Sequence, residues 1–185
     1  VRAVGGATTL PTSPLGPEFD LPVWPEGSPD DRDRIQAAVR MATPGYFDAL
    51  RLEIADGRPF DARDHPEAPP VVMVSATLAN RLWPAQTAVG QSLAVDYSTA
   101  GTAAYEVVGV VGDVSFQGPR SEPRAEIYLP HAQRSYLIMH VAIRSAGDPR
   151  ALIPAVRAVL RDVDPLKPAY GLTPLDDLLG ATMVR

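Results

Sequence analysis

The sequence predicts an α+β fold of two lobes, for three reasons. Strand-like and helix-like segments alternate, but without the regular beat of a parallel α/β fold. The two chain ends, residues 1–45 and 134–185, are patterned as strand, strand, then strand, helix, strand, which indicates a split βαβ lobe. Residues 46–133 carry their own strands and helices, and we expect them to form a second lobe inserted into the first.

Length, net charge, cysteine content and the lengths of the apolar stretches exclude several kinds of protein and of site. The 185 residues, 45% of them hydrophobic, suffice for one ordinary domain or two small lobes. A net charge of −5 gives no basic surface, so we expect no nucleic-acid partner and no polybasic attachment to lipid. The absence of cysteine excludes disulfides, thiol catalysis and thiolate metal sites. No apolar stretch approaches the roughly 20 residues that cross a bilayer, and we expect the chain to be an excised piece of a longer protein.

The first third of the chain is expected to contain two strands and one short helix. Residues 1–10 form a short strand, and residues 11–29, which include six prolines, form a long loop. Residues 36–43 alternate as a strand. Thr43 is the expected N-cap of a short helix that has Pro44 at its first position and presents Tyr46, Phe47 and Leu50 on one side.

The middle of the chain begins with a turn and a polar, proline-rich loop over residues 57–70. Residues 71–74 are a four-residue apolar run suited to a buried strand. Ser75 is the expected N-cap of a helix over residues 76–83, which a proline closes. Residues 89–95 are expected to be the next strand.

Residues 105–130 hold the most continuous apolar run in the chain. The run at 107–111 and the shorter one at 127–129 are bounded by turn residues, which is typical of buried strands. We expect the two strands to form the centre of a sheet, with their connecting loop facing water.

The C-terminal part is expected to be strand, helix, strand and helix. Residues 138–144 alternate as a half-buried strand. Asp148 then starts the clearest helix, whose apolar stripe is Leu152, Val156, Val159, Leu160 and Val163. Pro154 indicates either a kinked start or a regular helix that begins there. Residues 169–172 are a possible strand, and a capped helix begins after residue 173.

Signatures of catalysis and cofactor binding are absent. There is no Gly-x-x-x-x-Gly-Lys phosphate loop and no Gly-x-Gly-x-x-Gly after a strand, and the only lysine, Lys167, lies in a loop. Asp113 at the end of an apolar strand resembles a magnesium ligand, but without a phosphate loop it is better interpreted as the turn that ends the strand. We therefore expect no cofactor.

The histidines and the acidic residues do not form a recognisable site either. The three histidines occur singly, with no His-x-x-x-His pair, so we expect no metal site. Asp61, Asp64 and Glu67 could form an acid pair or a weak calcium loop, but they lack calcium-hand spacing, and a solvated loop is the preferred interpretation. No catalytic residue is assigned.

Aromatic and charged residues at loops and element ends are the candidates for an interface. Packing against the domain's own core, or a solvated loop, is the alternative for each of them. The candidates are Trp24, Trp83, Phe116, Arg120, Glu122, Arg124 and Tyr136.

An ordered series of short motifs runs through the chain. It begins with Thr-Pro-Gly-Tyr-Phe at residues 43–47 and Gly-Arg-Pro-Phe at 57–60. It continues with Val-Val-Met-Val-Ser at 71–75 and with Glu-Val-Val-Gly-Val-Val-Gly-Asp-Val at 106–114. Glu-Ile-Tyr-Leu-Pro follows at 126–130, and Gly-Asp-Pro at 147–149 and Asp-Pro at 164–165 complete it. The series covers nearly the whole chain and resembles the extracytoplasmic domain of MacB/FtsX-type ABC transporter permeases. Its wording is closer to the duplicated orphan permease subgroup than to macrolide exporters.

The resemblance implies a domain between two transmembrane helices, on the periplasmic side of the bacterial inner membrane. Its lobes would be a porter-like lobe, residues 1–45 and 134–185, and a sabre-like lobe, residues 46–133. The domain would not be an enzyme, because ATP would be hydrolysed by a cytoplasmic ATPase. It would relay movement of the transmembrane helices to a substrate or to a periplasmic adaptor protein. Such a family supplies no catalytic residue.

Two other functions stay open at the level of sequence. The domain could be a sensor that binds a ligand or peptide in a cleft between lobes, lined by residues 11–29. It could also be a hydrolase without a sequence signature, which would need converging His, Ser and Asp side chains. We expect the isolated domain to be a monomer.

Overall fold

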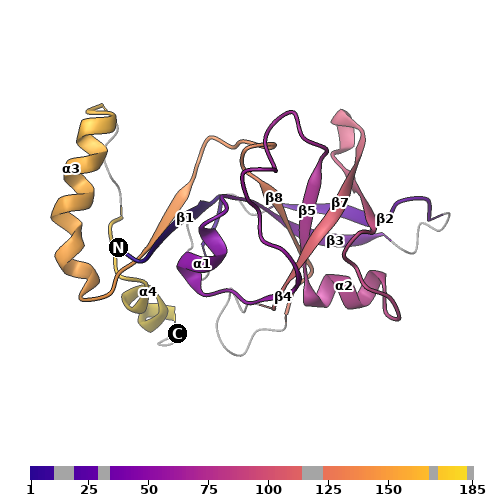
Figure 1. Cartoon of the computed structure of the whole chain (residues 1–185), viewed down its shortest axis with the longest axis horizontal. Coiled ribbons are helices and arrows are strands. Elements are labelled where there is room, and N and C mark those ends of the chain that lie inside the picture. Colours follow the sequence, from indigo (N-terminus) through magenta and orange to yellow (C-terminus); the bar gives the residue numbers. More distant parts are fainter. Residues whose placement is uncertain (11–18, 29–33, 114–122, 167–170, 183–185) are drawn as a thin grey trace.

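The computed structural model describes residues 1–10, 19–28, 34–113, 123–166 and 171–182. These residues form a mixed α/β structure around one large sheet (Figure 1). The strands are β1 (Ala3–Ala7), β2 (Asp20–Pro25), β3 (Ile35–Ala42), β4 (Ile54–Gly57), β5 (Val71–Ser75), β6 (Ser92–Asp96), β7 (Thr102–Val111), β8 (Glu126–Pro130) and β9 (His140–Arg144). The helices are α1 (Tyr46–Leu50), α2 (Ala76–Leu82), α3 (Ile153–Val163) and α4 (Leu175–Thr182), with short 3-10 turns η2 (Ser98–Ala100) and η3 (Pro149–Leu152).

Six of the strands close into a barrel. Their order is β2-β6-β7-β5-β8-β3, and a further pairing of β2 with β3 joins the two ends of this series. β7 is long enough to pair with β6 through its first half and with β4 through its second half. Closure gives each of the six strands a partner on both sides, which removes the free edge that a strand at the end of an open sheet would have.

The interior of the barrel is filled by the side chains that point inward from each strand. In β8, Ile127 and Leu129 point inward, opposite Val39 and Met41 of β3 in parallel register. Valines and leucines of β2, β5, β6 and β7 complete this core, and Leu78 of α2 closes one part of it. The alternation of inward and outward side chains follows from the two-residue period of a strand.

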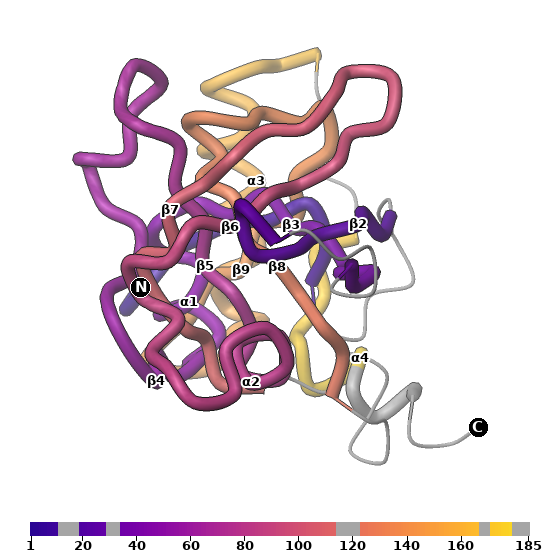
Figure 2. The backbone as a smooth tube through the Cα atoms, turned by 90° about the vertical axis from the view of Figure 1, so that its right-hand side faces the viewer, coloured from indigo at the N-terminus to yellow at the C-terminus, as the bar shows by residue number. Residues whose placement is uncertain are grey.

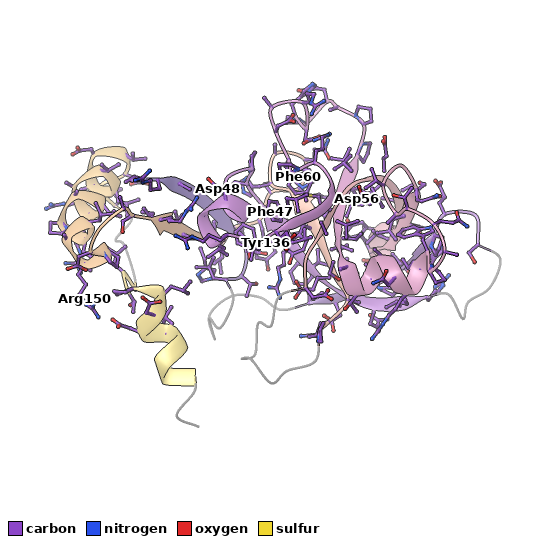
Figure 3. All side chains as sticks on the ribbon, turned by 60° about the horizontal axis from the view of Figure 1, so that its bottom comes forward. Phe47, Asp48, Asp56, Phe60, Tyr136 and Arg150 are labelled. Carbon is purple, nitrogen blue, oxygen red and sulfur yellow. The ribbon has the colours of Figure 1, made fainter. Side chains whose placement is uncertain are left out.

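A second apolar layer lies on the outside of the barrel, under α1. Tyr46 and Phe47 of this helix pack with Phe60 and with the outward-facing Tyr128 of β8. The ring centroids of Phe47 lie 5.4 Å from Tyr128 and 5.8 Å from Phe60, both in edge-on geometry (Figure 3). This layer fixes α1 to the barrel wall.

β1 and β9 form a two-stranded ribbon that leaves the barrel. β1 pairs with β9 over five residues and touches β3 through one pair, Ala7 with Ala42. The ribbon leads to η3, α3 and α4, which lie at the opposite end of the molecule from the barrel (Figure 1). We call the ribbon together with η3, α3 and α4 the arm.

Most of the expected elements are present, and several expectations are wrong in detail. The central strands at 105–111 and 127–129 are not neighbours, because β5 lies between them. β2 occupies part of the expected proline-rich loop, and β4 was not expected at all. The regular part of α3 begins at Ile153, so that Pro154 lies in its first turn, where it is tolerated.

The two helix caps expected from the sequence have different outcomes. Ser75 caps α2 by accepting a hydrogen bond from the Leu78 N–H at 3.2 Å, as predicted. Thr43 does not cap α1, whose N-cap is Gly45. The Thr43 hydroxyl instead accepts a hydrogen bond from the Gly6 N–H at 2.9 Å. Part of the expected strand at 169–172 lies outside the described residues.

The strand pairing also bears on how the chain divides. β2 and β3 come from residues 1–45 but are hydrogen bonded to β6 and β8 of residues 46–133. The barrel therefore crosses the boundary expected at residue 45. The arm and the barrel are the two parts that the arrangement of elements distinguishes (Figures 1 and 2).

Candidate interaction surfaces

The arm is fixed to the barrel at a joint between β1 and α1, where two glycines let two backbones touch. A Cβ atom on Gly5 would lie 2.1 Å from the backbone nitrogen of Tyr46, and a Cβ atom on Gly45 would lie 2.1 Å from the Val4 carbonyl oxygen. Side chains do not fit at such distances, so both positions require glycine. We call Gly5, Gly45 and the residues bonded across this contact the joint.

Hydrogen bonds hold the joint on both sides of the glycine contact. The Thr43 N–H donates to the Gly6 carbonyl at 2.8 Å, and the Gly6 N–H donates back to the Thr43 hydroxyl. At the far end of the ribbon, the Arg144 guanidinium pairs with the Asp48 carboxylate of α1. The ribbon is therefore bonded at two places, to Thr43 just before α1 and to Asp48 of α1, and α1 is packed on the barrel.

The arm carries most of the large exposed apolar side chains of the described residues. α3 has no buried residue, although its sequence is clearly amphipathic. The exposed apolar residues of the arm and of the segment that leads into it are Val1, Val4, Tyr136, Leu137, Ile138, Val141, Val159, Leu160, Val163 and Leu166. Apolar surface of this extent on one part of a domain usually marks a contact with something else.

A rigid polar loop, residues 58–70, projects from the barrel (Figures 1 and 2). The Arg58 guanidinium donates two hydrogen bonds of 2.8 Å to the carboxylate of the buried Asp64. The Gln133 side-chain amide donates to the carbonyl of Pro69 at 3.0 Å and accepts from the Val71 N–H at 3.1 Å, which ties the loop to the end of β8. Hydrogen bonds within the loop and hydrogen bonds to Gln133 therefore hold the conformation of the loop.

Two acidic residues of this loop, Asp61 and Asp64, form ion pairs with arginines. Burial raises the pKa of the Asp64 carboxyl, but the hydrogen bonds from Arg58 and from the Asp61 backbone more than offset burial, so the pKa is lowered. Asp61 is paired with Arg63 and Arg58. Asp61 and Asp64 are therefore structural partners of arginines. The solvated-loop interpretation describes Glu67, which is 83% exposed, but not Asp64, which is 4% exposed.

A buried ion pair lies on the outer face of the barrel between β3 and β8. Arg40 donates to the Glu126 carboxylate at 2.9 Å, and the Tyr128 hydroxyl donates to the other oxygen of the same carboxylate at 2.7 Å. Burial, together with the charge of Glu126, raises the pKa of Tyr128 well above its usual value. The hydroxyl keeps its proton, and the cluster acts as a fixed part of the wall.

The interface residues predicted from the sequence lie in different places. Trp83 is a core residue, 7% exposed, which the alternative of core packing describes. Trp24 is half-buried under the guanidinium of Arg34, at 4.3 Å from the ring centroid. Arg124 pairs with Asp20 at 3.0 Å, and the half-exposed Tyr136 packs against Phe19. Phe116, Arg120 and Glu122 lie outside the described residues.

The structure does not gather these predicted residues into one surface, and it adds two features that sequence reasoning missed. One is the joint, for which the Pro-Gly pair at residues 44–45 is a local signal of a turn but not of its partner strand. The other is the exposure of α3, whose apolar stripe was recognised in the sequence. Exposure of an amphipathic helix cannot be read from its own periodicity.

The described residues contain no group of three or more His, Asp or Glu side chains placed to hold a metal ion. A shallow hollow of about 230 Å³ between α2 and β4 is lined mainly by alanines together with Asp56, Asn80, Gln86 and Thr87. Within the described ranges no helix is long and apolar enough to cross a membrane.

Three solved structures share this arrangement of elements. The periplasmic region of MacB from Actinobacillus actinomycetemcomitans is 14% identical, with a TM-score of 0.60 over 88% of this chain and 67% of that one. The extracellular domain of the noncanonic ABC-type transporter YknZ from Gram-positive bacteria is 18% identical, with a TM-score of 0.56 over 91% and 79%. A domain of a putative permease from Porphyromonas gingivalis is 16% identical, with a TM-score of 0.53 over 88% and 64%. A comparison with curated proteins gives no match.

The fold therefore defines the class: a mixed α/β domain of the kind found outside the membrane in transporter permeases. The family model of the MacB-like periplasmic core domain matches residues 18–159, which is more than half of the chain. The chain belongs to that family. It is an extracytoplasmic domain of a MacB/FtsX-type permease, which confirms the family predicted from the sequence motifs.

Proposed function

We propose that the domain relays movement of the transmembrane helices of its transporter to a substrate or an adaptor protein outside the membrane. In the whole protein its partners are those transmembrane helices and a cytoplasmic ATPase, which supplies the energy. The domain itself carries out no chemistry in this proposal. The division into a porter-like and a sabre-like lobe is part of the same proposal. The pairing of β2 and β3 with other barrel strands favours assigning these two strands to the lobe that contains the rest of the barrel.

The joint is the observation that carries the proposal. A relay must transmit displacement without absorbing it, and the contact of Gly5 with Gly45 leaves no room for the ribbon to slide over α1. Thr43 and the Arg144–Asp48 pair resist rotation at the same place. Movement of the ribbon would therefore be passed to the barrel as a rigid-body motion.

The rigid loop at 58–70 is the proposed output of the relay. It projects from the barrel, and the bonds of Asp64 and Gln133 hold its shape (Figure 3 labels Phe60 near its base). A contact surface that is already ordered binds at a lower entropy cost than a flexible one. The ligand-sensing alternative gains no comparable support, since the shallow hollow beside α2 is not between the barrel and the arm.

Spin-label distances in the complete transporter, reconstituted in lipid discs, test the relay. One label replaces Arg63 in the projecting loop, and the other is placed at the extracytoplasmic end of a transmembrane helix that is not joined to the domain, so that the distance reports movement of the domain relative to that helix. We expect this distance to change by on the order of 5 Å between the nucleotide-free and ATP-trapped states. A control pair, Arg63→Cys with Thr102→Cys, lies wholly on the barrel and should not change.

Both other outcomes of this measurement contradict the proposal. If neither distance responds to nucleotide, the domain does not follow the transmembrane helices. If the control pair within the barrel changes as much as the test pair, the barrel deforms and does not act as a rigid lever.

A further inference from the structure

β4 is a short strand with one edge that no described strand covers. It pairs with β7 alone among the described strands, and it lies outside the six strands that close into the barrel. Its residues Ala55, Asp56 and Gly57 are all exposed. An uncovered strand edge presents backbone N–H and C=O groups to which an extended chain can add as a further strand. The backbone chemistry of this edge therefore favours an extended polypeptide as its occupant.

The hollow beside α2 lies next to this edge. β4 and α2 are neighbours at one end of the barrel, with the hollow between them (Figures 1 and 2). Binding sites for small molecules usually measure about 300–1,000 Å³, so a hollow of about 230 Å³ suits a single side chain better. The side chains of an added strand alternate between the two faces of the sheet, and every second one would lie on the α2 side. One of them would enter the hollow.

The charge at the hollow indicates which side chain fits. Among the described residues that line it, Asp56 alone is charged, and the apolar part of the lining is Ala55, Ala76, Ala79, Ala88 and Val110. The Asp56 carboxylate accepts from the Gly57 N–H at 2.8 Å and from the Thr87 hydroxyl at 3.0 Å. Both donors are neutral, so neither balances the negative charge. A lysine or arginine would lay its methylene groups on the alanines and bring its cationic end to Asp56.

The same charges argue against a second copy of this chain as the occupant. Residues 53–57 are Glu-Ile-Ala-Asp-Gly, which include acidic residues and no basic one. The next residue, Arg58, is already paired with Asp64. Pairing of β4 with β4 of another copy would gather the carboxylates of both copies at one interface, and like charges facing each other across strands are destabilising. A basic segment of a different protein does not meet this repulsion.

We propose that β4 and α2 form a docking groove for an extended segment of another extracytoplasmic protein, which adds to the edge of β4 and places a lysine or arginine side chain in the hollow beside Asp56. β4 has only four residues, so few backbone hydrogen bonds form and the side chain in the hollow selects the segment. The groove is separate from the projecting loop. It binds such a segment whether or not the domain acts as a relay.

Peptide titration of the 185-residue chain, followed by amide chemical shifts, tests the groove. The probe is a capped peptide, Thr-Val-Arg-Val-Thr, and its matched control carries citrulline, which has the shape of arginine without the charge. We expect saturable shifts at Ala55, Asp56 and Asn80, which line the hollow. The arginine peptide should bind at least about fivefold more tightly than the citrulline peptide.

Two variants test the role of the carboxylate. Asp56→Asn should remove the preference for arginine over citrulline. Glu106→Gln removes an exposed carboxylate of β7 that does not line the hollow, and it should keep the preference. The near-ultraviolet signal of the buried Trp83 reports that the barrel is intact in each variant.

Methylation of the peptide backbone tests strand addition separately. In an added strand, successive N–H groups point alternately toward β4 and away from it. One peptide carries N-methyl groups on both valines, and a second carries them on the arginine and the last threonine. Strand addition predicts that one of these two peptides loses binding while the other retains it.

Four results would overturn the proposal. The first is the absence of saturable shifts in the groove at millimolar peptide, and the second is equal affinity for the arginine and citrulline peptides. The third is an arginine preference that persists in Asp56→Asn, which would place the selecting charge elsewhere. The fourth is an equal effect of the two methylation patterns, which would mean that no strand is added.

Discussion

At the scale of single residues, Gly5 is the position on which the attachment of the arm depends most. Gly5→Ala places a methyl group 2.1 Å from the backbone nitrogen of Tyr46, so β1 or α1 must move. Overpacking of this kind costs about 1–3 kcal/mol of the free energy of unfolding. Gly147→Ala is the control, because its methyl group would meet nothing within 4 Å, and we expect it to be neutral or slightly stabilising.

Urea unfolding at pH 7 separates these two variants. The Gly5 variant should unfold at lower urea concentration with the same slope, while the Gly147 variant should match the unchanged chain or exceed it. Equal midpoints for the two alanine variants would show that the close contact at the joint does not hold in solution.

Asp64 gives a prediction that depends on pH. Its carboxylate is buried and receives two hydrogen bonds from Arg58, so Asp64→Asn should cost about 1–3 kcal/mol at pH 7. The pKa of Asp64 is lowered in the folded protein, so the stabilisation is complete above the ordinary value of 3.8. It is lost as the pH falls from there through the folded pKa.

Stability measured at several pH values checks the sign of this effect. The difference between the unchanged chain and Asp64→Asn should be constant from pH 7 to about pH 5 and should shrink below about pH 4. Glu67→Gln is the control, since the Glu67 side chain is 83% exposed and contacts only His65. A difference that grows as the pH falls would mean that the Arg58–Asp64 pair does not stabilise the loop.

At the scale of secondary-structure elements, the sequence predicted those whose signals are local. β5 and α2 follow from an apolar run and a serine cap, and α3 follows from its stripe. β2 was missed because it contains Pro22 and Pro25. Proline is tolerated there because Pro22 lies opposite β3 only and Pro25 lies opposite β6 only, so each has one side on which no strand requires its N–H.

The closing of the barrel and the joint could not be predicted from single segments. Closure depends on the pairing of β2 with both β3 and β6, and no residue of β2 specifies partners so far apart in the chain. The joint needs two glycines separated by about forty positions to meet in space. The family motifs indicated the fold only by resemblance and did not specify these contacts. The family could therefore be predicted from the sequence, whereas the contacts could not.

At the scale of the whole molecule, we expect the isolated domain to be a monomer at micromolar concentration. Among the described residues, each of the six strands that close the barrel has a partner on both sides, so these strands offer no edge to a second copy. Light scattering over a range of micromolar concentrations should give the mass of one chain. A stable dimer that dissociates on Val141→Lys would contradict this expectation and would identify the ribbon face as the contact between copies. A dimer that survives this substitution would contradict it equally and would direct attention to the barrel.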